Sequence, residues 1–264
     1  MPRIALIDCD IVNYSCCVGL DDMPVGAAYE RADGLIATIL QETKSDQCIL
    51  FQSGPREQNF RHIMWPLYKA NRKDAPRPKH LKAVEEYMYQ VNGAEISDCC
   101  EADDRLGINQ TEKTILCTID KDLDMVPGLH YNWRRKEIYE INNYAGQFNF
   151  WKQMLVGDST DNVKGVTGIG EKKATQRLQQ IETHEWPEYV KDLYDDNLRF
   201  DLNYNLLRIW QKPYQLYYDN KDNVMLNKEE FLAKLEELRD QFKALVPSED
   251  EEPTKQKEGN DETQ

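Results

Sequence analysis

The chain has 264 residues, of which 40% are hydrophobic, and a formal net charge of −14. This length and apolar content are enough for a large folded core, which excludes a disordered chain. No apolar run approaches the roughly 18 residues that a membrane helix needs, and the start MPRIALIDCDIV reads directly into a strand. We therefore expect a cytoplasmic protein without membrane contact, whose seven cysteines are reduced core thiols.

Short apolar runs alternate with longer amphipathic segments in the first half of the chain. Three runs are typical of buried strands: 4–12, 48–52 and 113–122. Four segments are typical of helices: 27–42, 60–71, 78–92 and 101–110. Strands separated by helices predict an α/β fold with a parallel sheet and crossover helices. A short hairpin follows, and from 144 to about 246 the chain is expected to be mostly helical.

These patterns divide the chain into three parts. We expect an α/β region at 1–150, a helical region at 151–246 and an acidic disordered tail at 247–264. The stretch 248–264 holds seven acidic and two basic side chains, so removing its −5 from the total of −14 leaves −9 for the body. A strongly acidic body argues against a nucleic-acid partner unless its charge is concentrated at one place.

Carboxylates follow the predicted strands and open one predicted helix. The acids in these positions are Asp8, Asp10, Glu101, Asp103, Asp104, Asp120, Asp122, Asp158 and Asp161. Each alone is explained by helix-dipole or turn chemistry. Together they would gather at the carboxyl ends of the strands, where ligands of open α/β sheets bind, and they would need a counter-charge. Oxygen-only ligands favour Mg²⁺ or Mn²⁺, and a two-metal carboxylate site suits phosphodiester hydrolysis, so we expect a nucleic-acid substrate.

The stretch GVTGIGEKKA directly follows the last acids. Gly165, Gly168 and Gly170 permit tight turns, and a helix begins just after them, so its unpaired N–H groups are expected to hold a phosphate. Lys172 and Lys173 add positive charge beside this turn. The stretch therefore predicts a DNA-binding turn next to the acidic site.

A basic segment, PLYKANRKDAPRPKH, lies in the predicted α/β region. Lys69 and Arg72 are three residues apart and would share a helix face, with Trp65 and Tyr68 interleaved for base stacking. Read alone, the segment is equally typical of a solvated basic helix end. The acidic clusters favour a role in substrate binding.

These motifs together resemble the 5′-nuclease superfamily, meaning flap endonucleases and the 5′→3′ exonucleases of bacterial polymerase I and bacteriophages. The resemblance is carried in order by LIDCD, YKANR, EADD, TIDKD and LVGDSTDNVKGVTGIGEKKA, and it ends near residue 180. It implies a PIN-like α/β domain, with a central mostly parallel sheet flanked by helices, followed by a helical DNA-binding region with a helix–three-turn–helix motif.

The resemblance also implies roles for individual residues. The more tightly bound of two Mg²⁺ ions, which Mn²⁺ can replace, would be held by Asp8, Glu101, Asp103 and Asp104. The remaining ligands, shared between the two ions, would be Asp120, Asp122, Asp158 and Asp161. Lys69 and Arg72 would contact the scissile phosphate, and Tyr68 would stack on the terminal nucleotide. We expect the catalytic set to be Asp8, Asp104, Asp158, Lys69 and Arg72. A K⁺ ion would bind carbonyls around 165–170.

The implied activity is 5′→3′ hydrolysis at the ends of duplex, gapped or flapped DNA, and of RNA primers in RNA–DNA hybrids, during replication in a bacterial or phage-infected cell. A single-strand-binding protein or a polymerase is the expected protein partner. Two departures from the family pattern are Cys9 followed by Asp10 after the first acid, and a short, proline-containing segment from Lys73 to Val84 in place of a long arch. Two alternatives are a non-catalytic binding factor for branched DNA and a PIN-like ribonuclease.

Overall fold

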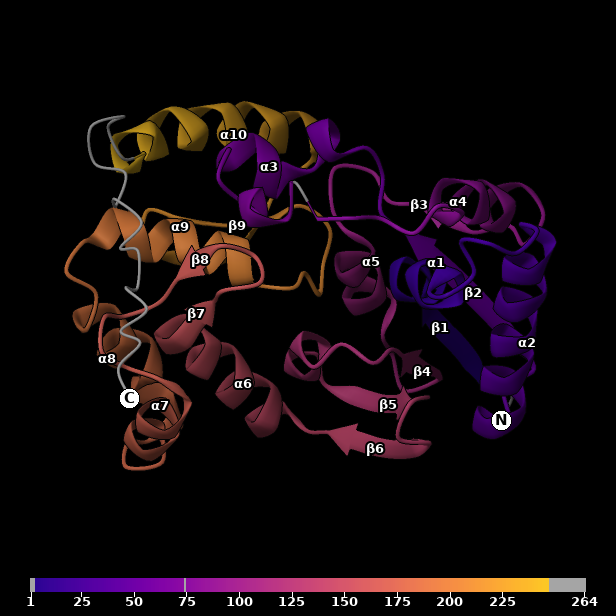
Figure 1. The fold of residues 1–264 in the computed structure, drawn as a ribbon. Helices are drawn as coiled ribbons and strands as arrows, with labels where there is room; N and C mark the ends of the chain where they lie inside the picture. Colours follow the sequence, from indigo (N-terminus) through magenta and orange to yellow (C-terminus); the bar gives the residue numbers. More distant parts are fainter. Residues whose placement is uncertain (1–2, 74, 247–264) are drawn as a thin grey trace, which may run out of the picture.

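The first half of the chain forms a six-stranded sheet. The computed structural model describes residues 3–73 and 75–246, and the expected acidic tail lies outside them. The strands are β1 (Ile4–Asp8), β2 (Gln47–Gln52), β3 (Glu95–Ile96), β4 (Thr114–Cys117), β5 (Gly128–Asn132) and β6 (Glu137–Ile141). Their order is β3-β2-β1-β4-β5-β6, and every pair is parallel except β5 with β6 (Figure 1). The predicted α/β fold with a mostly parallel sheet is confirmed.

The two faces of the sheet are buried against different partners. Side chains such as Ala5 and Ile7 of β1 pack with α1 (Cys9–Cys17), α2 (Gly26–Thr43) and α4 (Leu81–Gln90). The intervening Leu6 belongs to the other core, which includes α5 (Ala102–Asn109) and the second half of the chain. Because successive strand residues point to opposite faces, this alternation makes the sheet the central layer between two cores.

The second half is built from helices and two small hairpins. The helices are α6 (Asn143–Val156), α7 (Glu171–Leu178), α8 (Trp186–Asp192), α9 (Asn197–Leu207) and α10 (Lys228–Phe242). The hairpins pair β7 (Gly157–Asp158) with β8 (Val163–Lys164), and β9 (Gln215–Tyr218) with β10 (Lys221–Met225). Short 3₁₀ turns occur in both halves of the chain: η1 (Arg56–Gln58), η2 (Ala70–Arg72) and η3 (Asp122–Met125) in the first, η4 (Thr183–Glu185) and η5 (Lys243–Leu245) in the second. In the described ranges no helix is both long and apolar enough to cross a membrane.

Four elements differ most from those expected from the sequence. The strand expected over 113–122 ends at Cys117. β1 ends at Asp8 because the Asp8 side chain caps α1, accepting a hydrogen bond from the Ile11 N–H at 3.3 Å. The helix expected over 60–71 stops at Met64, so that α3 spans Phe60–Met64, because the residue before Pro66 disfavours helical backbone. The β9–β10 hairpin interrupts the region expected to be helical.

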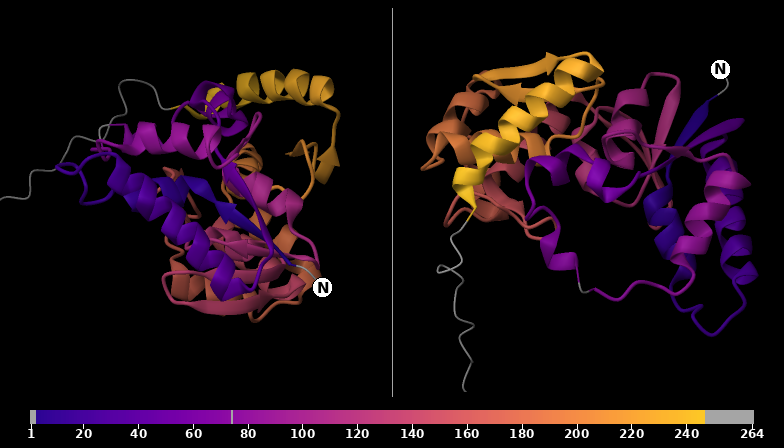
Figure 2. Two further views of the ribbon diagram at one scale, coloured as in Figure 1. Left: turned by 90° about the vertical axis from the view of Figure 1, so that its right-hand side faces the viewer. Right: turned by 90° about the horizontal axis from the view of Figure 1, so that it is seen from above.

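A buried ion pair joins the two halves of the molecule. Arg61 of α3 donates two hydrogen bonds to the Asp104 carboxylate of α5, at 2.6 and 2.9 Å, and both side chains are almost fully buried. The same guanidinium donates to the carbonyls of Leu206, in the last turn of α9, and of Arg208, just after the helix, and Asp104 accepts the Trp210 N–H. Nearby, α3 packs against α10 (Figure 2). The pair therefore fixes α3, α5 and the chain after α9 to one another.

Removing this pair is expected to destabilise the fold. Asp104→Ala removes both short hydrogen bonds of the buried guanidinium to a carboxylate and leaves it, among acids, only the longer contact of 3.5 Å with Glu101, so we expect a loss of about 3–5 kcal/mol in the free energy of unfolding, measured by urea denaturation. The control is Glu95→Ala, which breaks the 2.7 Å ion pair between Glu95 and Arg105. Because the Glu95 side chain is 51% exposed, this variant should lose about 1 kcal/mol or less in the free energy of unfolding. Equal losses in the two variants would contradict the central role of the buried pair.

Candidate functional site

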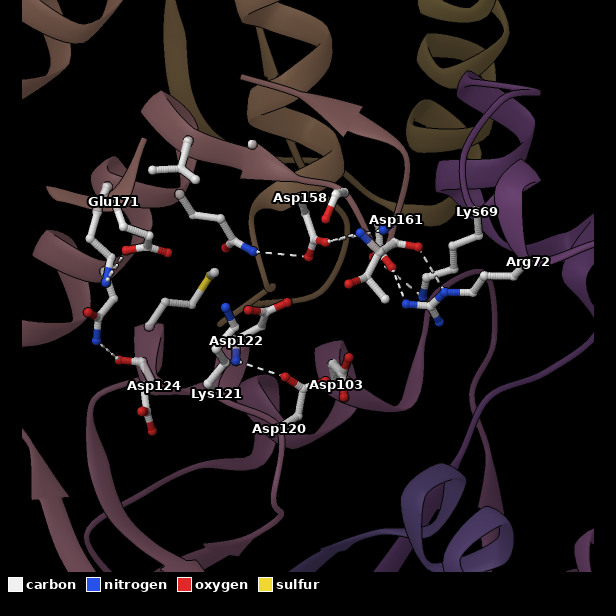
Figure 3. Close-up of a pocket in the computed structure, with 18 residues that line it drawn as sticks. Lys69, Arg72, Asp103, Asp120, Lys121, Asp122, Asp124, Asp158, Asp161 and Glu171 are labelled. Atoms are coloured by element: carbon white, nitrogen blue, oxygen red, sulfur yellow. Dashed lines mark hydrogen bonds and ion pairs between the residues drawn. The ribbon is translucent and has the colours of Figure 1, made fainter. Parts of the chain in front are cut away.

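A cleft of about 550 Å³ lies where the sheet meets α6 and α7. Seven of the residues singled out from the sequence line it (Figure 3). Five are acids, which we call the cleft carboxylates: Asp103, Asp120, Asp122, Asp158 and Asp161. The other two, which we call the basic pair, are Lys69 and Arg72. The chain thus brings acids from three separate segments together with the expected cations.

The strand ends place the first acids. Asp8 closes β1, is 1% exposed and accepts a hydrogen bond from the Thr118 hydroxyl at 2.9 Å. That hydroxyl also accepts the Asp120 N–H, and the Asp120 carboxylate accepts the Asp122 N–H at 2.9 Å. Thr118 thus connects the carboxyl ends of β1 and β4, which are neighbours in the sheet. The acids lie at the edge where ligands of such sheets collect.

These carboxylates are held in an environment that opposes their ionisation. Burial, and then the neighbouring Asp10, raises the pKa of Asp8 to about 7. Burial and the charges of Asp120 and Asp158 raise the pKa of Asp122 to about 7. The pKa of Asp103 is also raised, by burial and by Asp8 and Asp120. Such a group of acids gains stability from a bound cation.

The loop GDSTDN carries the remaining cleft carboxylates. Asp158 accepts hydrogen bonds from the N–H groups of Thr160 at 2.7 Å and Asp161 at 3.2 Å, which folds the loop around its side chain. Before it, Gly157 has a φ of +77°, and a Cβ there would lie 2.3 Å from the Gly165 nitrogen. The predicted need for glycine at 165 therefore comes from a close approach of two backbone segments.

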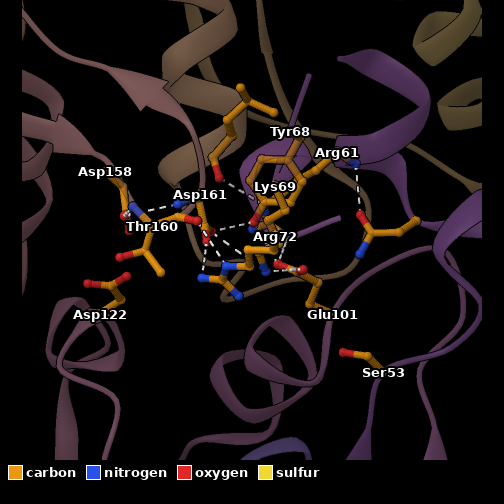
Figure 4. Close-up of polar contacts among 12 residues, drawn as sticks. Ser53, Arg61, Tyr68, Lys69, Arg72, Glu101, Asp122, Asp158, Thr160 and Asp161 are labelled. Atoms are coloured by element: carbon orange, nitrogen blue, oxygen red, sulfur yellow. Dashed lines mark hydrogen bonds and ion pairs between the residues drawn. The ribbon is translucent and has the colours of Figure 1, made fainter. Parts of the chain in front are cut away.

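The basic pair is engaged with acids on one side of the cleft (Figure 4). The Lys69 ammonium lies 2.5 Å from Glu101 and 3.6 Å from Asp161, and Arg72 contacts Asp161 at 2.6 Å. Burial opposes the ionisation of Glu101, but the charges of Lys69 and Arg61 outweigh it and lower its pKa to about 2. Burial likewise disfavours the charged form of Lys69, but Glu101 and Asp161 raise its pKa overall. Lys69 and Glu101 therefore stabilise each other's charged form, whereas burial raises the pKa of Asp161.

Two loops that are distant in sequence are joined along their backbones beside the basic pair. Lys69, which has a φ of +54°, donates its N–H to the Asp161 carbonyl at 2.9 Å. The Arg72 side chain donates to the Thr160 carbonyl, and the Asn162 side chain donates to the Leu67 carbonyl. Asn71 adds a bond to the carbonyl of Ser159. The segments 67–72 and 159–162 consequently form one rigid wall of the cleft.

Tyr68 does not have the open face expected of a stacking residue. Its side chain is 1% exposed, so its ring is not accessible to a nucleotide in this structure. Its hydroxyl lies within hydrogen-bond distance of two carboxylates, Glu101 at 2.9 Å and Asp161 at 2.8 Å, and can donate its proton to either. The burial follows from the fold of the wall, which the sequence pattern did not contain. The residue holds two acids in place.

Asp104 also differs from its expected place among the metal ligands. Its two oxygens accept four hydrogen bonds, two from Arg61 and one each from the N–H groups of Glu101 and Trp210. Its side chain is fully buried and does not line the cleft. Asp104 remains a predicted ligand, but in this structure its lone pairs are already used by hydrogen bonds. Asp8 and Glu101 do not line the cleft either, but Glu101 contacts Lys69, and Asp8 is linked to Asp120 through the Thr118 hydroxyl.

The predicted DNA-binding turn connects β8 to α7. Gly168 has a φ of +76°, which favours glycine, whereas a Cβ at Gly170 would meet no atom within 4 Å. Gly170 is the N-cap of α7, and Lys172 and Lys173 are exposed in its first turn. The Lys173 ammonium contacts the Gly168 carbonyl at 2.9 Å. The turn and its lysines are adjacent to the cleft, since the first residue of α7, Glu171, lines it.

Several residues that line the cleft were not singled out from the sequence. On α6 they are Asn149, Lys152, Gln153 and Val156. Their spacing places them on one face of the helix, and this spacing, immediately before the GD of the acidic loop, was the available signal. Gln153 donates to Asp158 at 3.4 Å. Lys121 and Asp124, from the chain after β4, complete the opposite wall.

The acids do not form a closed metal cage. Among residues 3–73 and 75–246, no three His, Cys, Asp or Glu side chains converge closely enough to enclose an ion. Their oxygens instead accept hydrogen bonds from the backbone, from Gln153 and from the basic pair, and like charges repel one another. The donor set is nevertheless oxygen-only, which fits hard divalent cations once the side chains turn inward.

Comparison with known proteins identifies relatives of this chain. No family model matches it. DNA polymerase I of Caldicellulosiruptor bescii is 29% identical over 191 residues, which are 62% of this chain and 22% of the polymerase. Flap endonuclease Xni of Shewanella sp. is 29% identical over 144 residues, 48% of this chain and 55% of the relative. The matches thus span about a fifth to about half of these relatives. They confirm the resemblance to flap endonucleases and polymerase I.

Solved structures share the fold. Bacteriophage T5 5′-exonuclease with bound zinc has a TM-score of 0.57 and 17% identity, and covers 78% of this chain and 89% of its own. Bacteriophage T5 flap endonuclease, in a pseudo-enzyme–product complex with DNA and metal ions, has a TM-score of 0.58 and 16% identity. The match covers 90% of this chain and 100% of the T5 chain. The arrangement of sheet and helices is therefore that of the T5 enzyme.

The raised acid pKa values predict an unusual pH dependence of stability without metal. Asp8 and Asp122 bind a proton more tightly in the folded than in the unfolded chain, so their contribution is present below pH 4 and is lost as the pH rises through about 7. In EDTA, Asp122→Asn should be about 2 to 4 kcal/mol more stable than wild type at pH 8 and equal to it at pH 4, because each pKa unit corresponds to roughly 1.4 kcal/mol.

The measurement is urea unfolding at both pH values, with Asp22→Asn as the control because Asp22 is exposed outside the cleft. A stability difference that does not change with pH would contradict the raised pKa of Asp122 as its cause.

Proposed function

We propose that this chain is a divalent-metal-dependent nuclease that hydrolyses phosphodiester bonds at 5′ ends of duplex, gapped or flapped DNA. The observation that carries the proposal is one cleft that combines the cleft carboxylates with the basic pair. A phosphodiester needs both, because metals bound by acids activate water while cationic side chains stabilise charge on the phosphate. The relatives named above support the same assignment.

The metal ligands are proposed from the geometry of the cleft. The cleft carboxylates, together with Asp8 and Glu101, offer oxygen ligands only, which favours Mg²⁺ with Mn²⁺ as a substitute over zinc. Two bound ions would generate the attacking hydroxide and neutralise the leaving oxygen. Asp158 and Asp122 face one another across the cleft, close enough for the charge of Asp158 to raise the pKa of Asp122. They are the best placed to share an ion.

The basic pair supplies charge from the protein itself. Lys69 and Arg72 are ionised donors at the rim, and their present partners, Glu101 and Asp161, are among the proposed ligands. When those acids are neutralised, the attraction that holds the pair falls, and a phosphate can take their place. In the transition state, the negative charge on the phosphate oxygens increases, so these donors bind it more strongly than they bind the ground state.

The remaining roles divide along the chain. We assign catalysis mainly to residues 1–150 and DNA binding to 151–246, with Asp158 and Asp161 contributed by the second part to the cleft of the first. The turn with Gly165, Gly168 and Gly170, together with Lys172 and Lys173, is proposed to hold a duplex phosphate, assisted by K⁺ on its carbonyls. RNA–DNA hybrids are a further proposed substrate. A replicating bacterial or phage-infected cytoplasm, with a polymerase or single-strand-binding protein as partner, is the proposed setting.

The activity is tested with Asp158→Asn. The amide keeps an oxygen that can accept the N–H groups of Thr160 and Asp161 but removes the charge needed for the metal. We expect wild type to release label from a 5′-labelled flap duplex in Mg²⁺ and not in EDTA, and the variant to lose cleavage by at least about a thousandfold while retaining duplex binding. Wild type that binds the duplex without cutting it in Mg²⁺ or Mn²⁺ would indicate a binding factor. Preference for single-stranded RNA would indicate a ribonuclease.

The role of Lys69 is tested by separating rate from binding. Lys69→Met should lower the single-turnover rate at saturating enzyme by about 100-fold, since a charged donor to the developing charge is lost, and should change the half-saturating enzyme concentration less than threefold. Lys113→Met is the control, because Lys113 precedes β4 at the opposite end of the sheet. An unchanged maximal rate in Lys69→Met would remove this residue from the chemical step.

A further inference from the structure

Besides the basic pair and Lys121, the cleft has a further cation at its far end, on a helix face that no sequence motif marked. Lys152 of α6 lines the cleft and pairs with Glu171, the first residue of α7, at 3.3 Å. Figure 3 shows Glu171 at one end of the cleft and the basic pair at the other, with Asp122 and Asp158 between them. Any phosphate bound at the carboxylates is therefore flanked by cations on both sides.

The two ends differ in how firmly their cations are held. Glu101 and Asp161, the partners of the basic pair, are 13% and 17% exposed. Glu171 is 60% exposed, and Lys152 is 27% exposed. An ion pair this open to water is weak and screened by salt. Glu171 also keeps the stabilisation of the α7 N-terminus when its partner leaves, because a carboxylate is favourable there. Because its partner acid is the most exposed of the three, Lys152 has the cleft ion pair that an added anion can replace most easily.

We propose that Lys152 leaves Glu171 to bind a second phosphate of the nucleic-acid strand, on the far side of the carboxylates from Lys69 and Arg72. The inference rests on the proposed function. A strand is a regular series of phosphates, so one that crosses the cleft brings phosphates to both ends. Glu171 competes for Lys152 and repels the strand, so it lowers affinity at this subsite. Lys152 is a binding residue, and the reacting phosphate belongs to the basic pair.

The test uses single-turnover cleavage of a 5′-flap duplex in Mg²⁺, with enzyme titrated to saturation at several salt concentrations. Lys152→Met should raise the half-saturating concentration about three- to tenfold, leave the maximal rate unchanged and reduce the slope of log affinity against log salt by about 0.9. Glu171→Gln should lower the half-saturating concentration. In the Glu171→Gln background the loss caused by Lys152→Met should be larger than in wild type, because Lys152 is then free of its competitor.

Three results would overturn the inference. If Lys152 only braces α6 against α7, both single variants weaken binding and lower the urea midpoint together. If its effect is only that of general charge, Lys152→Met and Lys113→Met weaken binding equally, and the double variant with Glu171→Gln is additive. If neither variant changes the half-saturating concentration, Lys152 does not contact the strand. These outcomes are distinct from failure of the proposed function, in which wild type itself releases no product.

Discussion

The buried pair between Arg61 and Asp104 is the interaction on which the arrangement of this molecule depends. A guanidinium that is fully enclosed needs every donor satisfied, and Arg61 meets this need with the Asp104 carboxylate and two carbonyls at the end of α9. The requirement ties the helix that carries Glu101 and Asp103 to the helical half. Asp103 of α5 therefore reaches the cleft in a fixed orientation, because the next residue, Asp104, is held by Arg61 and the Trp210 N–H.

The cleft has the opposite electrostatic character. Its acids repel one another, and the raised pKa values of Asp8 and Asp122 express the free-energy cost of keeping them ionised together. Lys69 and Arg72 balance only one side, at Glu101 and Asp161. Two neighbouring carboxylates of one short helix thus lie in different environments: Asp104 accepts four hydrogen bonds, whereas burial and the charges of Asp8 and Asp120 raise the pKa of Asp103.

The position of the acids at the strand ends could be predicted from the sequence, because a short apolar run followed directly by Asp is visible within a few residues. The glycine turn could be predicted as well, because a backbone with positive φ, as at Gly168, favours glycine at that single position. The sequence did not predict the burial of Tyr68 or the commitment of Asp104, since both depend on partners more than 30 residues away, Glu101 for the first and Trp210 for the second. The early end of β1 was missed because Asp8 serves as a helix cap, a role that its apolar neighbours conceal.

The wall formed by 67–72 and 159–162 has a consequence for how such chains can be recombined. Its bonds pair backbone groups of one loop with side chains or backbone of the other: Lys69 with Asp161, Arg72 with Thr160, Asn162 with Leu67. Neither loop keeps its shape without its partner. A chimera that takes the first loop from a relative is expected to need the second loop with it, although nearly ninety residues of chain separate the two.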